Sequence, residues 1–140
     1  MSQMLLETDQ VLGLKGQSSA LDWSERVSKG LPTESLEAIC RALSPEDGSL
    51  IYRIVPRSTL IRRRRQARLH PEESEVVQRL AEIWALAVNI FGDEDKARRF
   101  LKRAHPLLRG ALPLDLVIAN SQGAKAVEGI LGRLKYGSAA

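Results

Sequence analysis

Arginine is concentrated in one short part of the sequence. Between Gly48 and Pro71 there are seven arginines, at positions 53, 57, 62, 63, 64, 65 and 68, and no acidic residue. The rest of the chain carries 14 basic and 17 acidic residues, so the net charge of +4 comes from this stretch. Such a local excess of guanidinium groups is typical of a surface that contacts nucleic acid. A solvated helix face is the simpler alternative, but such faces usually mix both signs of charge.

Most of these arginines fall on the second of two short predicted helices. The first is expected to start at Ser44 and to end before Pro56, and the second to run from Ser58 to Gln66. Two helices joined by a turn of three or four residues form a helix-turn-helix. The second helix of that motif enters the major groove of DNA.

The predicted recognition helix divides its residues between an outer and an inner face. The first turn of such a helix meets base edges, and its flanks meet phosphates. Arginine suits both targets, because it can bind guanine or phosphate through two parallel hydrogen bonds. Leu60 and Ile61 are expected to face inward. The residues expected to contact DNA are Arg57, Ser58, Thr59, Arg62, Arg63 and Arg65.

Catalytic and metal-binding chemistry has little support in the sequence. His70 and His105 each stand beside a proline, and neither has a second metal ligand at a suitable spacing. Cys40 lies on the apolar side of a predicted helix, which favours a buried thiol over a nucleophile. The chain contains no phosphate-binding glycine loop and no nucleophile motif. We therefore expect no enzyme activity, no cofactor, no metal and no small-molecule substrate.

Composition favours a helical fold. Hydrophobic residues make up 44% of the chain but aromatic residues only 4%, so the core must consist mainly of aliphatic side chains. That composition suits helices better than sheets. No apolar run is long enough to span a membrane, the first residues do not resemble a secretory signal, and a single cysteine fits a reducing compartment. The expected fold class is all-α, in a cytoplasmic protein with no membrane partner.

Start and stop signals predict seven or eight helices and no strand. Thr33 is expected to cap one of these helices and His70 to stand at the start of the longest. The expected segments outside the helix-turn-helix are a loosely held arm over 1–18 with room for one helical turn, helices over 22–29, 34–43, 71–91, 94–101 and 121–136, and a short turn over 113–118.

Several stretches of the chain resemble one known family. Residues 56–64 and 69–75 are similar to the pattern P-x-x-T-L-x-R-R … L-x-x-x-E-S of the Xre/MbcA/ParS antitoxins. The resemblance extends from about Val11 to Gly137. The chain departs from the family in Phe100, where a tryptophan is usual, in Arg109-Gly110 and in Ala119–Ser121. The stretches similar to the family's C-terminal toxin-binding domain are Phe91–Asp93, Phe100-Leu101, Pro113–Leu116, Gly123 and Leu131–Gly137.

The resemblance implies an antitoxin that neutralises a RES-domain toxin, an enzyme that consumes NAD or transfers ADP-ribose from it. It implies an N-terminal arm (1–18), an Xre-like helix-turn-helix DNA-binding domain (19–70) and a helical toxin-binding and dimerisation domain (71–140). The implied partners are the cognate RES-domain toxin, promoter DNA and a second copy of the chain. One short recognition helix reads few bases, which also favours a homodimer, with the long helix from Glu72 to Phe91 as its apolar surface.

The family's C-terminal segment reaches the toxin's active-site cleft. A cation and a phenol suit a pocket that binds phosphates and a ring, although basic residues at a helix C-terminus are also favoured by the helix dipole. Two other functions stay open, a stand-alone helix-turn-helix transcriptional regulator and a protein inhibitor that no longer binds DNA. An adjacent RES-like reading frame would favour the antitoxin. The residues implied for toxin binding are Leu131, Arg133, Leu134, Lys135 and Tyr136.

Overall fold

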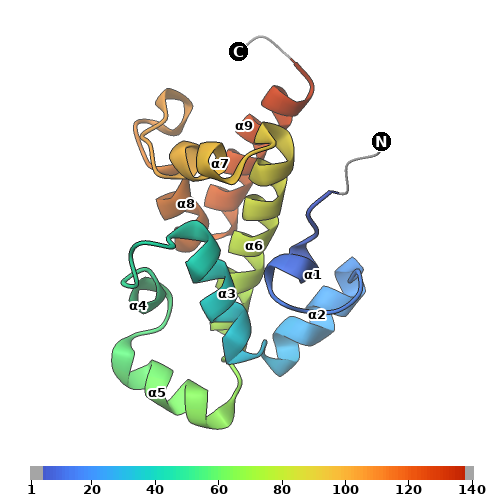
Figure 1. Cartoon of the computed structure of the whole chain (residues 1–140), viewed down its shortest axis with the longest axis vertical. Helices are drawn as coiled ribbons and strands as arrows, with labels where there is room; N and C mark the ends of the chain where they lie inside the picture. Colours follow the sequence, from blue (N-terminus) through green and yellow to red (C-terminus); the bar gives the residue numbers. More distant parts are fainter. Residues whose placement is uncertain (1–4, 138–140) are drawn as a thin grey trace.

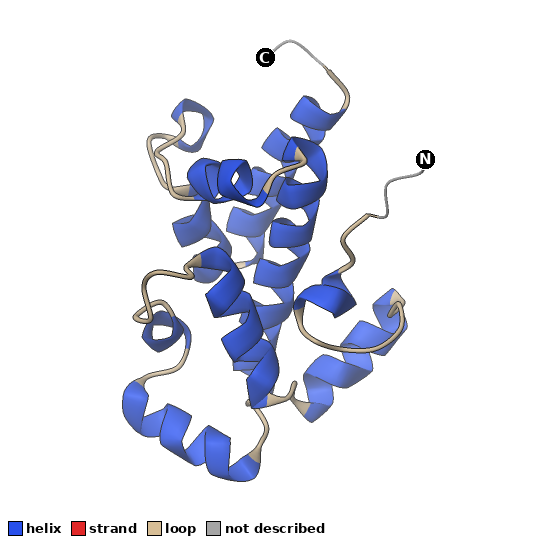
Figure 2. Cartoon of the chain, viewed as in Figure 1, coloured by secondary structure: helices blue, strands red, loops and turns tan. Residues whose placement is uncertain are grey.

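A single long helix, α6 (Pro71–Phe91), runs through the middle of the molecule, and most other helices lie against it (Figure 1). The computed structural model describes residues 5–137, and every regular element in that range is a helix (Figure 2). The predicted all-α fold class is confirmed. None of these helices is both long enough and apolar enough to cross a membrane. The other elements are α1 (Thr8–Val11), α2 (Ala20–Lys29), α3 (Thr33–Leu43), α4 (Ile51–Ile54), α5 (Arg57–Gln66), α7 (Glu94–Leu101), the 3-10 helix η1 (Pro106–Leu108), α8 (Pro113–Ala119) and α9 (Ser121–Lys135).

The ends of α6 are set by local signals, and its predicted bounds are confirmed. Pro71 occupies the first helical position, where its missing N–H costs nothing. His70 caps the helix by accepting a hydrogen bond from the Glu72 N–H at 3.3 Å, and Glu73 accepts one from the His70 N–H at 2.8 Å. Gly92 ends the helix in the left-handed conformation, with a φ of 68°.

Helix α6 is apolar on several sides because two groups of helices pack on it. Helices α1, α2 and α3 contact it, and so do α7, α8 and α9, so the predicted boundary before Pro71 runs through one continuous core. Most of the apolar surface that the sequence suggested for dimerisation is therefore used within one protomer. The buried apolar residues of α6 are Val77, Leu80, Ala81, Ile83, Trp84, Ala85 and Ala87.

The described part of the predicted arm, residues 5–18, packs on the core, so the prediction of a loosely held arm is wrong there; residues 1–4 of the arm lie outside the described residues. Leu12 is buried, and the buried carboxylate of Asp9 accepts hydrogen bonds from the N–H and the hydroxyl of Ser18. The side chain of Asn89 on α6 bonds both backbone groups of Leu6, at 2.8 and 2.9 Å. The sequence of the arm gave no sign of these contacts, because their partners lie up to 83 residues away.

The helix predicted to start at Ser44 begins only at Ile51. Asp47 accepts a hydrogen bond from the backbone N–H of Ser49 at 2.9 Å, and this local turn competes with helix formation. Gly48 between them adds backbone freedom that further disfavours a helix. As a result α4 is a single turn, and two residues rather than three or four connect it to α5.

Two smaller predictions are also corrected. Thr33 is the first residue of α3 and not its cap, because Pro32 precedes the helix in an extended conformation. The segment from Pro113 forms a helix, α8, rather than a turn. Its C-terminal carbonyl groups are satisfied by a tertiary contact, since Arg79 on α6 donates a hydrogen bond to the Val117 carbonyl at 2.8 Å.

The segments just before and just after the helix-turn-helix region are joined by hydrogen bonds. The N–H of Leu69 donates to the Leu31 carbonyl at 2.8 Å, and the N–H of Leu31 donates to the buried Ser74 hydroxyl at 2.8 Å. Gly30 permits this approach, because a Cβ there would lie 2.2 Å from the Leu69 carbonyl oxygen. Arg68 donates a further hydrogen bond to the Gly30 carbonyl. These contacts fix the connection between α2 and α3 to the segment that joins α5 to α6 and to the first turn of α6.

Candidate functional site

Helix α5 lies at one end of the molecule, at the bottom of Figure 1. Of its ten residues only Leu60 is buried. Because Leu60 is the only buried side chain of the helix and Thr59 and Arg63 are half-buried, most of its remaining circumference faces solvent. Five of its ten residues are arginines, so this end of the molecule carries a dense positive charge.

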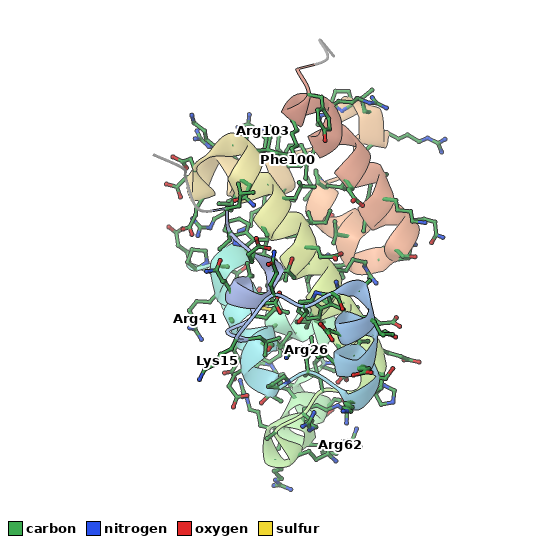
Figure 3. The ribbon with its side chains drawn as sticks, turned by 90° about the vertical axis from the view of Figure 1, so that its right-hand side faces the viewer. Lys15, Arg26, Arg41, Arg62, Phe100 and Arg103 are labelled. Carbon is green, nitrogen blue, oxygen red and sulfur yellow. The ribbon has the colours of Figure 1, made fainter. Side chains whose placement is uncertain are left out.

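One face of α5 brings together several of the residues that the sequence singled out. Ser58, Ile61, Arg62 and Arg65 recur at the spacing of neighbours on one helix face, and all four are exposed. Figure 3 labels Arg62 at this end of the molecule, far from Phe100 at the other. The prediction that Ile61 faces inward is wrong. Each residue advances about 100° around a helix, so the turn that buries Leu60 carries the next residue outward.

The arginines of this region differ in whether another side chain holds them. Within residues 5–137, neither Arg62 nor Arg65 makes a hydrogen bond or an ion pair, so both can reach a ligand. Three others contact side chains that are partly accessible to solvent, and such contacts are weak enough to be exchanged for phosphate. These are Arg53 with Asp115 at 2.8 Å, Arg57 with the ring of Tyr52 at 4.0 Å and Arg64 with Glu37 at 3.2 Å.

Arg63 is placed differently from the other predicted DNA contacts. Its Nε lies 2.7 Å from the Glu73 carboxylate, and the two side chains are only 16% and 14% exposed. The hydrogen bond to Glu73 raises the pKa of Arg63 further above its usual range. Glu73 also accepts the His70 N–H, so the pair joins α5 to the first turn of α6. This geometry makes Arg63 a residue that positions the helix. No pattern in the sequence indicates that Arg63 and Glu73 pair with each other.

The N-terminus of α5 is open to an anion. Pro56 precedes the helix and has no side-chain acceptor, so no side chain caps the first N–H groups. Ser58 is exposed and Thr59 half-buried, which places a hydroxyl group beside these donors. Free N–H groups and the positive end of the helix dipole together favour a phosphate oxygen. Arg57 adds a positive charge in the same turn.

The predicted toxin-binding residues lie at the opposite end of the molecule, where α9 ends (Figure 1). Leu131 is completely buried, so its assignment as a contact residue is corrected: it belongs to the core. Arg133, Leu134 and Lys135 are exposed, and Tyr136 is 80% exposed with Lys135 Nζ 5.6 Å from its ring centroid. This end therefore presents a phenol and adjacent cations.

A pocket with aromatic and cationic walls lies at this same end, and no pattern in the sequence indicated it. The ring of Phe100 stands 5.5 Å from that of Phe91 and 6.0 Å from that of His105, measured between centroids. Lys96, Arg99 and Arg103 also line the pocket. The residues come from α6, α7 and the loop after it, so only the tertiary fold assembles them.

The two histidines cap helices, and the cysteine is buried in the core. His105 accepts a hydrogen bond from the Leu107 N–H at 3.1 Å and so caps η1, as His70 caps α6. Burial raises the pKa of the Cys40 thiol to about 12, with a further contribution from the negative charge of Glu37. A thiol with that pKa is protonated at neutral pH and is a poor nucleophile, as the sequence indicated.

Comparison with known protein families matches nearly the whole described chain. Residues 22–82 match the antitoxin Xre-like helix-turn-helix domain. Residues 86–137 match the antitoxin Xre/MbcA/ParS C-terminal toxin-binding domain. A search among curated proteins gave no match. The first matched range ends and the second begins inside α6, the helix that both halves of the core contact.

Proposed function

The chain belongs to the Xre/MbcA/ParS antitoxin family, and from this we propose that it neutralises a RES-domain, NAD-consuming toxin and represses its own promoter. One observation carries the proposal. The arginine-rich helix α5 and the exposed end of α9 lie at opposite ends of the molecule. A single protomer could therefore hold DNA and toxin at the same time. We infer that it acts in the cytoplasm, where both partners would be met.

The proposed DNA contacts are made by α5 in the major groove of the promoter. Arg62 and Arg65 supply unpaired guanidinium groups on the outer face, and Ser58 lies beside them. Arg57 and Thr59 stand in the first turn, where free backbone N–H groups favour a phosphate. Arg63 acts indirectly, because its bond to Glu73 sets the angle of the helix.

The proposed toxin contacts are made by the end of α9 and the surface beside it. Arg133, Leu134, Lys135 and Tyr136 would enter the toxin's NAD cleft and exclude its substrate. Most binding energy would come from a larger surface, because interface energy concentrates in apolar and aromatic anchors. The aromatic and cationic pocket around Phe100 is such a surface at the same end of the molecule.

We also propose that the antitoxin is a homodimer. One α5 helix reads only a few base pairs, and a two-fold pair of helices reads two half-sites. Light scattering at micromolar concentration should give twice the mass of the chain. A single-chain mass both with and without promoter DNA would contradict the dimer. Since α6 is used within the protomer, we expect the dimer surface on the outer helices.

Co-expression with the product of the neighbouring gene tests the function most directly. We expect the two proteins to copurify, the free partner to consume NAD, and the complex to suppress that activity. The complex should also bind the DNA upstream of its own gene in preference to unrelated DNA. Promoter binding without copurification would instead indicate a stand-alone regulator. Copurification with a partner that leaves NAD intact would contradict the RES-toxin assignment.

A further inference from the structure

Ile61 is the one large apolar side chain on the outer face of α5. It is 55% exposed, one turn of helix from Ser58 and Arg65, and directly beside Arg62. No packing requirement in the protomer explains an isoleucine there, because Leu60 already fills the inward position. A branched side chain is also held in few rotamers, so its methyl groups point in a defined direction.

The charge around Ile61 limits what can cover it. Helix α5 has five arginines and no acidic residue, and the two carboxylates that pair with it, Glu37 and Glu73, bind Arg64 and Arg63. A second copy of the same face would oppose like charges, which disfavours self-association there. A partner that covers this face must therefore carry an excess of negative charge and must also offer an apolar group that the Ile61 side chain can reach.

The major groove of DNA offers that combination. Phosphates supply the negative charge, and the C5-methyl group of thymine is the apolar group on the groove floor. We infer that Ile61 contacts a thymine methyl and so contributes base specificity to the operator, next to contacts made by Arg62. This inference rests on the proposed DNA binding by α5.

Replacing thymine by uracil in the promoter tests the contact without knowledge of the operator sequence. Uracil lacks only the methyl group, so its hydrogen-bonding pattern is unchanged. The upstream fragment is prepared with dTTP or with dUTP, and its affinity is measured by fluorescence anisotropy for the wild-type chain and for Ile61→Ala. Ile61 is exposed, so the substitution should not disturb folding. Leu107→Ala is the matched control, because Leu107 is also 55% exposed and lies in η1, away from α5.

We expect uracil to weaken wild-type binding about fourfold for each methyl group contacted, and about fifteenfold for two half-sites, as burial of one methyl-sized group predicts. Ile61→Ala should bind thymine DNA correspondingly more weakly and lose most of this sensitivity to uracil. Leu107→Ala and Arg62→Ala should keep the sensitivity to uracil, although Arg62→Ala should bind both DNAs more weakly.

Each other outcome overturns a specific statement. If the wild-type chain prefers its promoter but is insensitive to uracil, or if Ile61→Ala is as sensitive as wild type, Ile61 does not contact a thymine methyl. If the wild-type chain binds promoter and unrelated DNA equally, the proposed promoter recognition fails first, and the inference fails with it.

Discussion

Removing the residues after Leu131 should leave the antitoxin bound to its toxin while restoring NAD consumption. Within the described residues, the removed part from Arg133 to Gly137 is exposed and carries a phenol and two cations, whereas Leu131 and the core beneath it remain. Blocking a cleft requires only that it be occupied, but affinity depends on buried anchors elsewhere. We therefore expect affinity to fall by no more than about tenfold, equivalent to about 1.4 kcal/mol, with most of the free toxin's activity recovered.

The measurement pairs copurification with an assay of NAD in the same samples. Lys135→Ala with Tyr136→Ala is a milder variant that keeps the last turn of α9 and should act in the same direction. Lys125→Ala removes one exposed cation earlier on α9 and serves as the control. Joint loss of binding and inhibition would make the tail the anchor itself. Full inhibition by the truncated chain would assign neutralisation to another surface.

Replacing Arg62 and Arg65 together by alanine should weaken promoter binding by about a hundredfold or more. In a dimer the double substitution removes four guanidinium groups, and each good contact to a base or phosphate is worth about 1–3 kcal/mol. The slope of log affinity against log salt should also fall by roughly 3 to 4, if these groups contact phosphates. Arg65 is chosen as the second substitution instead of Arg63. Arg63 is held by Glu73, so replacing it would also disturb the position of the helix.

The matched control removes the same charge at the other end of the molecule. Arg99→Ala with Arg103→Ala changes net charge equally but lies beside Phe100, away from α5 (Figure 3). It should change promoter affinity less than threefold, on the order of 0.6 kcal/mol. Circular dichroism should give the same helicity for both variants. Equal losses for the two pairs would mean that total charge, and not the face of α5, drives binding.

The local signals in the sequence were sufficient to predict where most helices begin and end. Proline and histidine at the start of α6, glycine at its end and Asp93 before α7 are caps whose effect acts over three or four residues. The prediction of a helix from Ser44 failed because a local turn at Asp47 and Gly48 forms there instead of a helix. Sequence-based prediction also failed for residues 5–18 of the arm, which are held by contacts with distant residues such as Asn89.

The sequence by itself determined the helical class, the arginine cluster and its position after a turn, and the resemblance to an antitoxin family. These follow from spacing and composition, which act along the chain. Only the tertiary structure decided which side chains of α5 and α9 are available. It buried Leu131, turned Ile61 outward and bound Arg63 to Glu73. The reason is that exposure depends on how each helix is rotated against α6, and that rotation is set by packing between residues far apart in sequence.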